Sequence, residues 1–132
     1  MANINVVTII DGEVNFEANI QNTLTSFQDI VGGHIEIPYV SSILSEHGID
    51  MIINEEGKLI DLPFTIALIV NNDKIVDIVH GNVVFASHDG EGNTTALSDN
   101  QKDVLRNLLK TKAILGTSNG DDVYPVFIIP VE

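Results

Sequence analysis

The stretch Val31-Gly32-Gly33-His34-Ile35-Glu36-Ile37-Pro38 predicts the end of a helix followed at once by a strand. Glycine enters the left-handed backbone conformation at little cost, so Gly32 and Gly33 are expected to end the helix. The next residues alternate polar and apolar side chains, which is typical of a half-buried strand. Pro38 has no backbone N–H for a strand ladder, so it closes that strand or lies on a sheet edge.

The residues before this stretch have the spacing of an amphipathic helix, which we predict over about residues 22–31. Asn22 or Thr23 is suited to cap its amino end through a side-chain oxygen. The apolar positions recur once per turn, at Leu24, Phe27, Ile30 and Val31.

A second helix is predicted over about residues 98–112. Ser98 and Gln101 have the spacing of a capping box, in which each side chain binds the backbone N–H of the other residue. The buried side of this helix should carry Val104, Leu105, Leu108 and Leu109. A basic ridge lies on a neighbouring face at i, i+4 and i+8, formed by Lys102, Arg106 and Lys110.

The amino-terminal residues predict a β-hairpin, because Asp11-Gly12 is a favoured two-residue turn between two strand-like runs. A further turn is expected at Asn54-Glu55-Glu56-Gly57-Lys58-Leu59, and a short helix within residues 40–48. Periodicity leaves Phe64–Val70 open between a strand and a buried helix. Strands are also expected at residues 49–53, 75–80, 83–86 and 123–129. Because the last contains Pro125, it is expected either to lie at a sheet edge or to begin just after that residue.

These elements predict a single α+β domain over residues 1–132. We expect a mostly antiparallel sheet of about five to seven strands, with the two main helices covering one face.

The charge of the chain limits its partners. Nineteen acidic residues against six basic ones give a net charge of −13. Binding a phosphate backbone requires clustered Lys and Arg, so no nucleic-acid partner is expected. Solubility explains the acidity most simply, and attraction to a basic partner surface, including mimicry of DNA, is the alternative.

The cellular compartment is predicted from the absence of membrane-spanning runs, a secretion signal and cysteine. No apolar run is long enough to span a bilayer, and the first residues do not resemble a secretion signal, so we expect no membrane association. The chain contains no cysteine, which excludes a disulfide framework and a thiolate site. A cytoplasmic protein is the expectation.

A search for chemistry in the sequence finds no catalytic constellation. The four histidines, His34, His47, His80 and His88, lack the spacing of a metal motif. The loop that begins at Asp89 starts like a calcium loop but has Thr94 where the turn needs glycine and Asn100 where glutamate is needed. Adjacent acids such as Glu55 and Glu56 do not readily converge on one substrate. We expect no catalytic residues, no metal and no cofactor.

Four short motifs carry a family resemblance: residues 31–36 (VGGHIE), 54–59 (NEEGKL), Leu62-Pro63, and 77–84 (DIVHGNVV). Together they resemble a family of phages, plasmids and Gram-positive bacteria known as domain of unknown function 3846, over roughly residues 5–102. The resemblance implies a mobile-element accessory protein and no established activity. The family has an Asn-Arg pair shortly after Leu-Pro, where this chain has Thr65 and Ile66, so a ligand site built on that arginine would be lost.

We therefore expect first a non-enzymatic module that binds a protein partner or self-associates. The alternative is a protein that binds a small anionic, nucleotide-like ligand. Its site would combine backbone amides around Gly32 and Gly33, or around Gly81 and Asn82, with a cation from Lys102, Arg106 or Lys110. A hydrolase-type enzyme is the third hypothesis, and it requires a histidine and a carboxylate, for instance near His34 and His80, to meet in one cleft.

Overall fold

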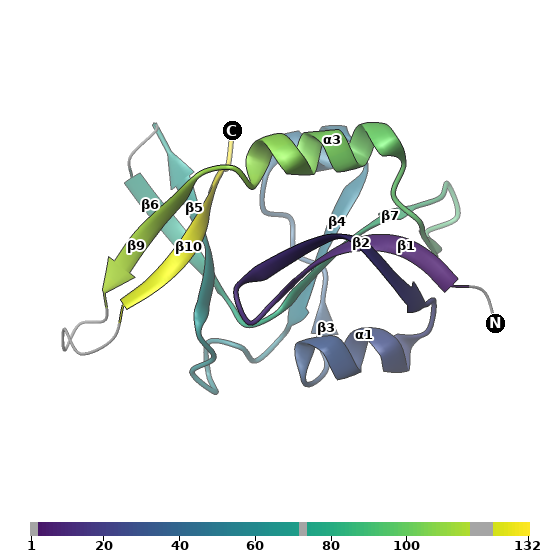
Figure 1. The fold of residues 1–132 in the computed structure, drawn as a ribbon, viewed down its shortest axis with the longest axis horizontal. Coiled ribbons are helices and arrows are strands. Elements are labelled where there is room, and N and C mark those ends of the chain that lie inside the picture. The colour runs from purple at the N-terminus through teal and green to yellow at the C-terminus, as the bar shows by residue number, and fades with distance from the viewer. Residues whose placement is uncertain (1–2, 72–73, 117–122) are drawn as a thin grey trace.

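A computed structural model of the chain describes residues 3–71, 74–116 and 123–132. Figure 1 shows its strands and helices. The helices are α1 (Leu24–Val31), α2 (Ser42–Glu46) and α3 (Asp99–Leu108). The strands are β1 (Asn3–Ile10), β2 (Glu13–Gln21), β3 (Ile35–Glu36), β4 (Ile49–Asn54), β5 (Phe64–Val70), β6 (Lys74–His80), β7 (Val83–His88), β8 (Thr94–Thr95), β9 (Lys112–Gly116) and β10 (Val123–Pro130).

The described strands form two sheets instead of the expected one. The first sheet has the order β2-β1-β7-β4-β3, with β8 paired to β7, and the second has the order β6-β5-β10-β9. The pairings are antiparallel except that of β10 with β5, which is parallel. The α+β class and the antiparallel character are thus confirmed. The chain leaves the first sheet after β4 through a long loop, and β5 begins the second sheet.

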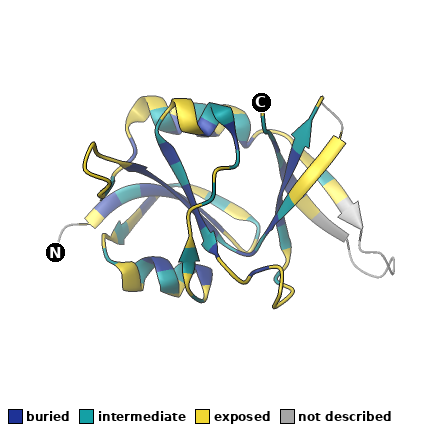
Figure 2. Ribbon diagram, turned by 180° about the vertical axis from the view of Figure 1, so that it is seen from behind, coloured by how far each residue is buried: buried dark blue, intermediate teal, exposed yellow. Residues whose placement is uncertain are grey.

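The two main helices cover opposite faces of the first sheet, so the expectation of one covered face is wrong (Figure 1). Phe27 of α1 packs against Val84 of β7, and Leu105 of α3 belongs to the cluster of the neighbouring residue Phe85. Successive side chains of a strand point to opposite faces. Because Val83 to Ala86 are all buried, both faces of the sheet are apolar and need cover, as Figure 2 illustrates.

Several boundaries differ from expectation at the carboxyl end. Helix α3 ends at Leu108 with Leu109 as its cap, and Lys112 begins strand β9. Strand β10 is internal, between β5 and β9, and it begins at Val123, before Pro125. Both expectations for this strand, an edge position and a start after Pro125, are therefore wrong. Pro125 is tolerated because β5 pairs with β10 only from Phe127 onward, which leaves Pro125 paired on one side alone.

Other local predictions are confirmed. Asp11 and Gly12 both have positive φ angles, 52° and 82°, as a type I′ hairpin turn requires. Phe64–Val70 is a strand, and the short helix within residues 40–48 is α2. The loop after Asn54 is longer than the tight turn expected, because residues 56–62 form turns closed by their own backbone hydrogen bonds.

The end of α1 is held by two asparagines that are distant in the sequence, Asn54 at the end of β4 and Asn82 in the turn before β7. Gly32 caps the helix with a φ of 82°, as predicted. The side-chain amide of Asn54 donates to the carbonyl of Val31 at 3.1 Å, and that of Asn82 donates to the carbonyl of Ile30 at 2.9 Å. Both asparagine oxygens also accept a backbone N–H, from Glu56 and from Asp11 respectively. The helix is thereby tied to both strands.

The Leu62-Pro63 motif also contacts this region, through hydrogen bonds to His80 at the end of β6 and to Gly81, which follows it. The N–H of Gly81 donates to the carbonyl of Pro63 at 2.8 Å, and the hydroxyl of Thr65 donates to the carbonyl of Gly81 at 2.5 Å. His80 Nδ1 lies 2.9 Å from the carbonyl of Leu62. We call this meeting of residues 31–36, 54–59, 62–65 and 80–82 the motif junction.

Replacing Gly81 with alanine should destabilise the fold. Its φ is +87°, and an added Cβ would lie 2.7 Å from Cδ1 of Leu62. We expect Gly81→Ala to lower the free energy of unfolding by roughly 2–4 kcal/mol, the combined cost of left-handed backbone and overpacking. Urea denaturation measures this. Gly90→Ala is the control, since an added Cβ there meets nothing within 4 Å, and equal losses in both variants would contradict the role of the junction.

Candidate functional site

A cavity of about 590 Å³ forms a groove beside the motif junction, where the two sheets approach each other. Its walls come from the end of β4 and the loop that follows, from the segment around Tyr39, and from β6. We call it the interface groove. Its lining residues are Glu36, Pro38, Tyr39, Val40, Ile53, Asn54, Glu55, Gly57, Lys58, Leu59, Leu68, Val76, Asp77, Ile78, Val79, His80 and Val131.

One wall of the groove is the free edge of β6. This strand is last in the order β6-β5-β10-β9, so in the described residues only one of its edges pairs. Val76 to His80 all line the groove. Successive side chains point to opposite faces of a strand, so a cavity that touches five residues in a row runs along the strand edge. Lys74 to Asp77 are all exposed, as the yellow colouring in Figure 2 shows.

The rim of the groove carries large apolar side chains in contact with solvent. Tyr39 is 72% exposed, Leu59 is 85% exposed and Val76 is 49% exposed. Exposed apolar residues are ordinary when scattered, whereas these three surround one cavity. The sequence analysis missed them. Leu59 was expected at the end of a tight turn, and its place in a longer loop is decided by the backbone hydrogen bonds of residues 56–62.

The groove also contains an ion pair between Lys58 and Asp77. The hydrogen bond from the Lys58 ammonium, helped by the backbone N–H of Ile78, lowers the pKa of Asp77 below its ordinary value. Glu36 and Glu55 line the groove as well, and neither carboxylate has an ion pair within the described residues. The charge of the groove is therefore negative.

A second cavity of about 480 Å³ lies on the other side of the motif junction. It is lined by three of the predicted ligand-binding residues, Gly32, Gly81 and Asn82, while Gly33 lines a smaller neighbouring pocket. The backbone amides of Gly32 and Gly33 both donate to the carbonyl of Gln28. The charged side chains that line this cavity are Asp11 and Asp29. In the described part of the chain, these amides already donate hydrogen bonds within the protein, and no Lys or Arg lines the cavity to pair with an anionic ligand.

The basic ridge lies elsewhere, on α3, which covers the opposite face of the first sheet from α1 (Figure 1). Lys102 is only 6% exposed, and its ammonium lies 3.1 Å from the carboxylate of Glu17 on β2. Arg106 pairs with Glu17 and Asp103 and lies over the ring of Phe16. Lys110 is exposed. The structure therefore separates the two halves of the predicted anion site, and the ridge helps to dock α3 on the amino-terminal hairpin.

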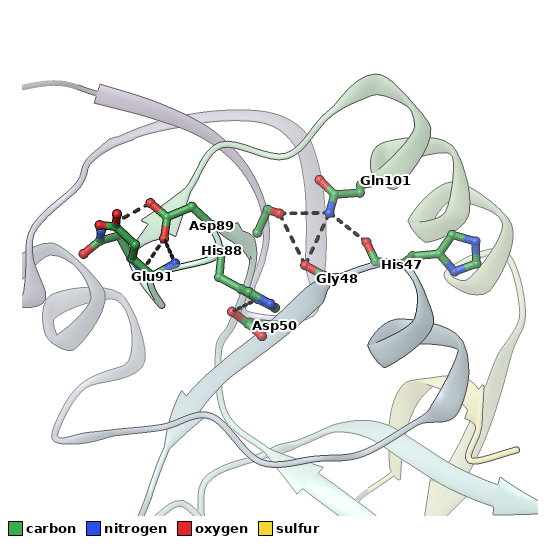
Figure 3. A network of polar contacts seen from close by, with 9 residues as sticks. His47, Gly48, Asp50, His88, Asp89, Glu91 and Gln101 are labelled. Carbon is green, nitrogen blue, oxygen red and sulfur yellow. Dashed lines mark hydrogen bonds and ion pairs between the residues drawn. The ribbon is translucent and has the colours of Figure 1, made fainter.

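The two histidines that the enzyme hypothesis names, His34 and His80, do not face one cleft. His80 lines the interface groove and His34 lines a different pocket. Figure 3 shows an arrangement that sequence reasoning missed: His88 Nδ1 lies 3.0 Å from the carboxylate of Asp50, beside a cavity of about 290 Å³. Within the described residues, the hydrogen bond of the His88 side chain is to Asp50, and no hydroxyl forms a hydrogen bond with the ring.

Gln101 has a structural role in the same network (Figure 3). Its amide nitrogen donates to the carbonyl of His47 at 2.8 Å and to the hydroxyl of Ser87 at 2.9 Å. Its oxygen accepts the N–H of Ser98, which completes the predicted capping box. Gln101 thus fixes the start of α3 against α2 and β7.

The loop at Asp89 is closed by its own hydrogen bonds. Asp89 accepts the N–H groups of Glu91 and Asn93, each at 2.9 Å, and the hydrogen bonds from Asn93 lower the pKa of Asp89 most. Among the described residues, no three His, Asp or Glu side chains are grouped so that they could hold a metal. No helix in the described ranges is long and apolar enough to cross a membrane.

Comparison with known proteins identifies the family. The sequence model of a family described as "Domain of unknown function (DUF3846)" matches residues 4–110. This match confirms the resemblance, and the chain belongs to that family. No curated protein and no solved structure matches the chain. All four motifs that carried the resemblance lie at the motif junction.

The Lys58–Asp77 pair predicts a pH-dependent contribution to stability. The folded pKa of Asp77 lies below the ordinary 3.8, so the folded state favours the ionised carboxylate. That contribution is complete above 3.8 and is lost as pH falls through the folded pKa. The side chain is 52% exposed, so Asp77→Asn should lower the free energy of unfolding by less than about 1 kcal/mol at neutral pH.

Urea denaturation of both proteins from neutral pH to below 3.8 would show the difference shrinking to zero. Glu91→Gln is the control, because its side chain has no ion pair within the described residues and its effect should be small throughout. A difference between Asp77→Asn and the natural protein that grows on acidification would contradict the assignment.

Proposed function

We propose that this member of the DUF3846 family is a non-enzymatic protein-interaction module that binds an extended segment of a partner protein in the interface groove. It would act in the cytoplasm as an accessory factor of a phage or plasmid, the setting that the resemblance implies. The single observation that carries the proposal is the ring of exposed apolar side chains, Tyr39, Leu59 and Val76, around a cavity that runs along a free strand edge.

Energetic considerations support the groove as a binding surface. Exposed apolar area gains about 25 cal/mol for each Å² removed from water, so three large side chains around one cavity offer a compact source of binding energy. Aromatic residues such as Tyr39 are enriched among the residues that dominate protein interfaces. A free strand edge adds backbone hydrogen bonds that are independent of side-chain identity.

The other sheet edges support this choice by contrast. In the first sheet, β3 has only two residues, Ile35 and Glu36, and the chain turns away at Pro38. In the second sheet, β9 is the opposite edge, and its exposed Ile114 does not line a described cavity of substantial volume. The other edge of the first sheet is β2, which has nine residues, but its apolar side chains pack against the core clusters and none of its residues lines the interface groove. Among these edges of the described residues, β6 combines exposed apolar side chains with an adjoining groove.

The proposal is tested by selecting peptides from a random display library on the immobilised protein and measuring their affinity by fluorescence polarisation. We expect Leu59→Ser combined with Val76→Ser to weaken binding at least tenfold, equivalent to about 1.4 kcal/mol. Both side chains are exposed, so the fold should be retained, and urea denaturation verifies this.

Ile114→Ser is the matched control. Ile114 is 72% exposed, as Tyr39 is, and it lies outside the groove, so its replacement should leave the affinity unchanged. Failure to select any peptide, or an equal loss in the control variant, would refute the proposal. Light scattering gives a second readout. A mass of 14.3 kDa at every protein concentration would mean that the protein does not self-associate and that the groove binds a foreign partner.

A further inference from the structure

We infer that the segment bound in the interface groove is a basic, apolar β-strand of another protein, which pairs with the free edge of β6 and places Lys or Arg against Glu36 and Glu55. This inference rests on the proposed function and specifies the chemistry of the partner. Three features carry it: the geometry of the groove, the charge of its walls and the internal pairing of most cations of the chain.

The geometry favours an extended occupant. The groove follows β6 from Val76 to His80. At the His80 end the edge is covered, because Gly57 packs so closely that an added Cβ would lie 2.9 Å from the carbonyl oxygen of His80. Toward Lys74 the strand is exposed along its length. Val79 is buried and the N–H of Ile78 donates to the carboxylate of Asp77 at 2.8 Å. An added strand would therefore pair with the exposed part of β6, from Lys74 to Asp77, and reach the groove at Val76.

The side walls would receive alternate side chains of that strand. Tyr39 and Leu59 offer apolar surface at the rim, and Leu68, Val79 and Val131 line the groove more deeply. An apolar residue at every second position of the added strand would face these walls, because strand side chains alternate with a period of two.

The charge of the groove specifies the remaining positions. Lys58 is neutralised by Asp77, whereas Glu36 and Glu55 are exposed and have no ion pair in the described part of the chain. Two carboxylates beside an apolar groove favour a segment that carries Lys or Arg and disfavour an acidic one.

The rest of the surface strengthens this preference. Of the six Lys and Arg residues, Lys58, Lys102 and Arg106 form ion pairs, and Lys112 lies 4.6 Å from the centroid of the Phe127 ring. Lys74 and Lys110 form no ion pair within the described residues. A chain with a net charge of −13 and most cations engaged internally attracts basic partners from a distance as well as in the groove.

A second copy of this chain is a poorer occupant. Its β6 would bring Lys74 together with Asp77, so the strand itself adds no net charge to the groove. Two copies that each carry −13 also repel each other. The groove and the overall charge both select a foreign, basic segment.

The test uses two synthetic display libraries of peptides of about eight residues, the length of an ordinary strand. Both have Val or Ile at alternate positions, with Lys or Arg between them in one library and Asp or Glu in the other. We expect at least tenfold greater enrichment of the basic library on the natural protein. Combining Glu36→Lys with Glu55→Lys should abolish or reverse that preference.

The matched control combines Glu46→Lys with Glu91→Lys, which changes the net charge equally but alters acids outside the groove. It should retain most of the preference for basic peptides. N-methylation of the best basic peptide then tests strand pairing. Because N–H groups on one side of a strand recur at every second residue, methylation of one alternate set should weaken binding at least tenfold and methylation of the other set should not.

The outcomes separate the two proposals. Equal loss of the preference in both charge variants, enrichment of acidic peptides, or equal effects of the two methylation sets would overturn this inference. The proposed function would still stand if binding continued to require Leu59 and Val76. Absence of any groove-dependent binding would overturn both. A dimer that dissociates on Val76→Ser would show that a second copy is the occupant and would also overturn the inference.

Discussion

The fold depends on how the carboxyl end of α1 is satisfied. The last carbonyls of a helix have no partner within the helix, and the last turn of α1 contains no basic residue to offset them. Asn54 and Asn82 supply the missing donors from the end of β4 and the turn before β7. Each side chain also accepts a backbone N–H from a turn. Two amide groups thus hold a helix, two strands and two turns in one arrangement.

This constraint explains why the motifs that identify the family say little about its activity. The backbone N–H groups of Gly32 and Gly81 and the side chains of both asparagines are all engaged in hydrogen bonds to other residues of the fold. The residues with free surface lie beside the junction, on the rim of the interface groove. The junction builds the groove by fixing the loop after β4 against β6, and the exposed side chains give the groove its chemistry.

Features that depend on neighbouring residues alone were predicted correctly from the sequence. Glycine at a helix end, Asp-Gly in a hairpin turn and the Ser98–Gln101 capping box were all predicted, and all are present. Prediction failed where the result depends on distant partners. Lys102 looked like part of an exposed ridge because helical spacing shows only which residues share a face. Burial against β2 and pairing with Glu17 depend on a strand that lies far away in the sequence.

The sequence by itself determined the α+β class, the family, the helix ends and the negative charge, because these follow from neighbouring residues and from composition. Only the tertiary structure decided that the described strands form two sheets, that the two main helices lie on opposite faces of the first sheet, and that β6 pairs along one edge alone within the described residues. The tertiary structure also decided what residues 31–38 do in the fold. The diglycine ends the helix as expected, but what makes this stretch central is Asn54 and Asn82, which reach it from other parts of the chain through hydrogen bonds that no sequence spacing reveals.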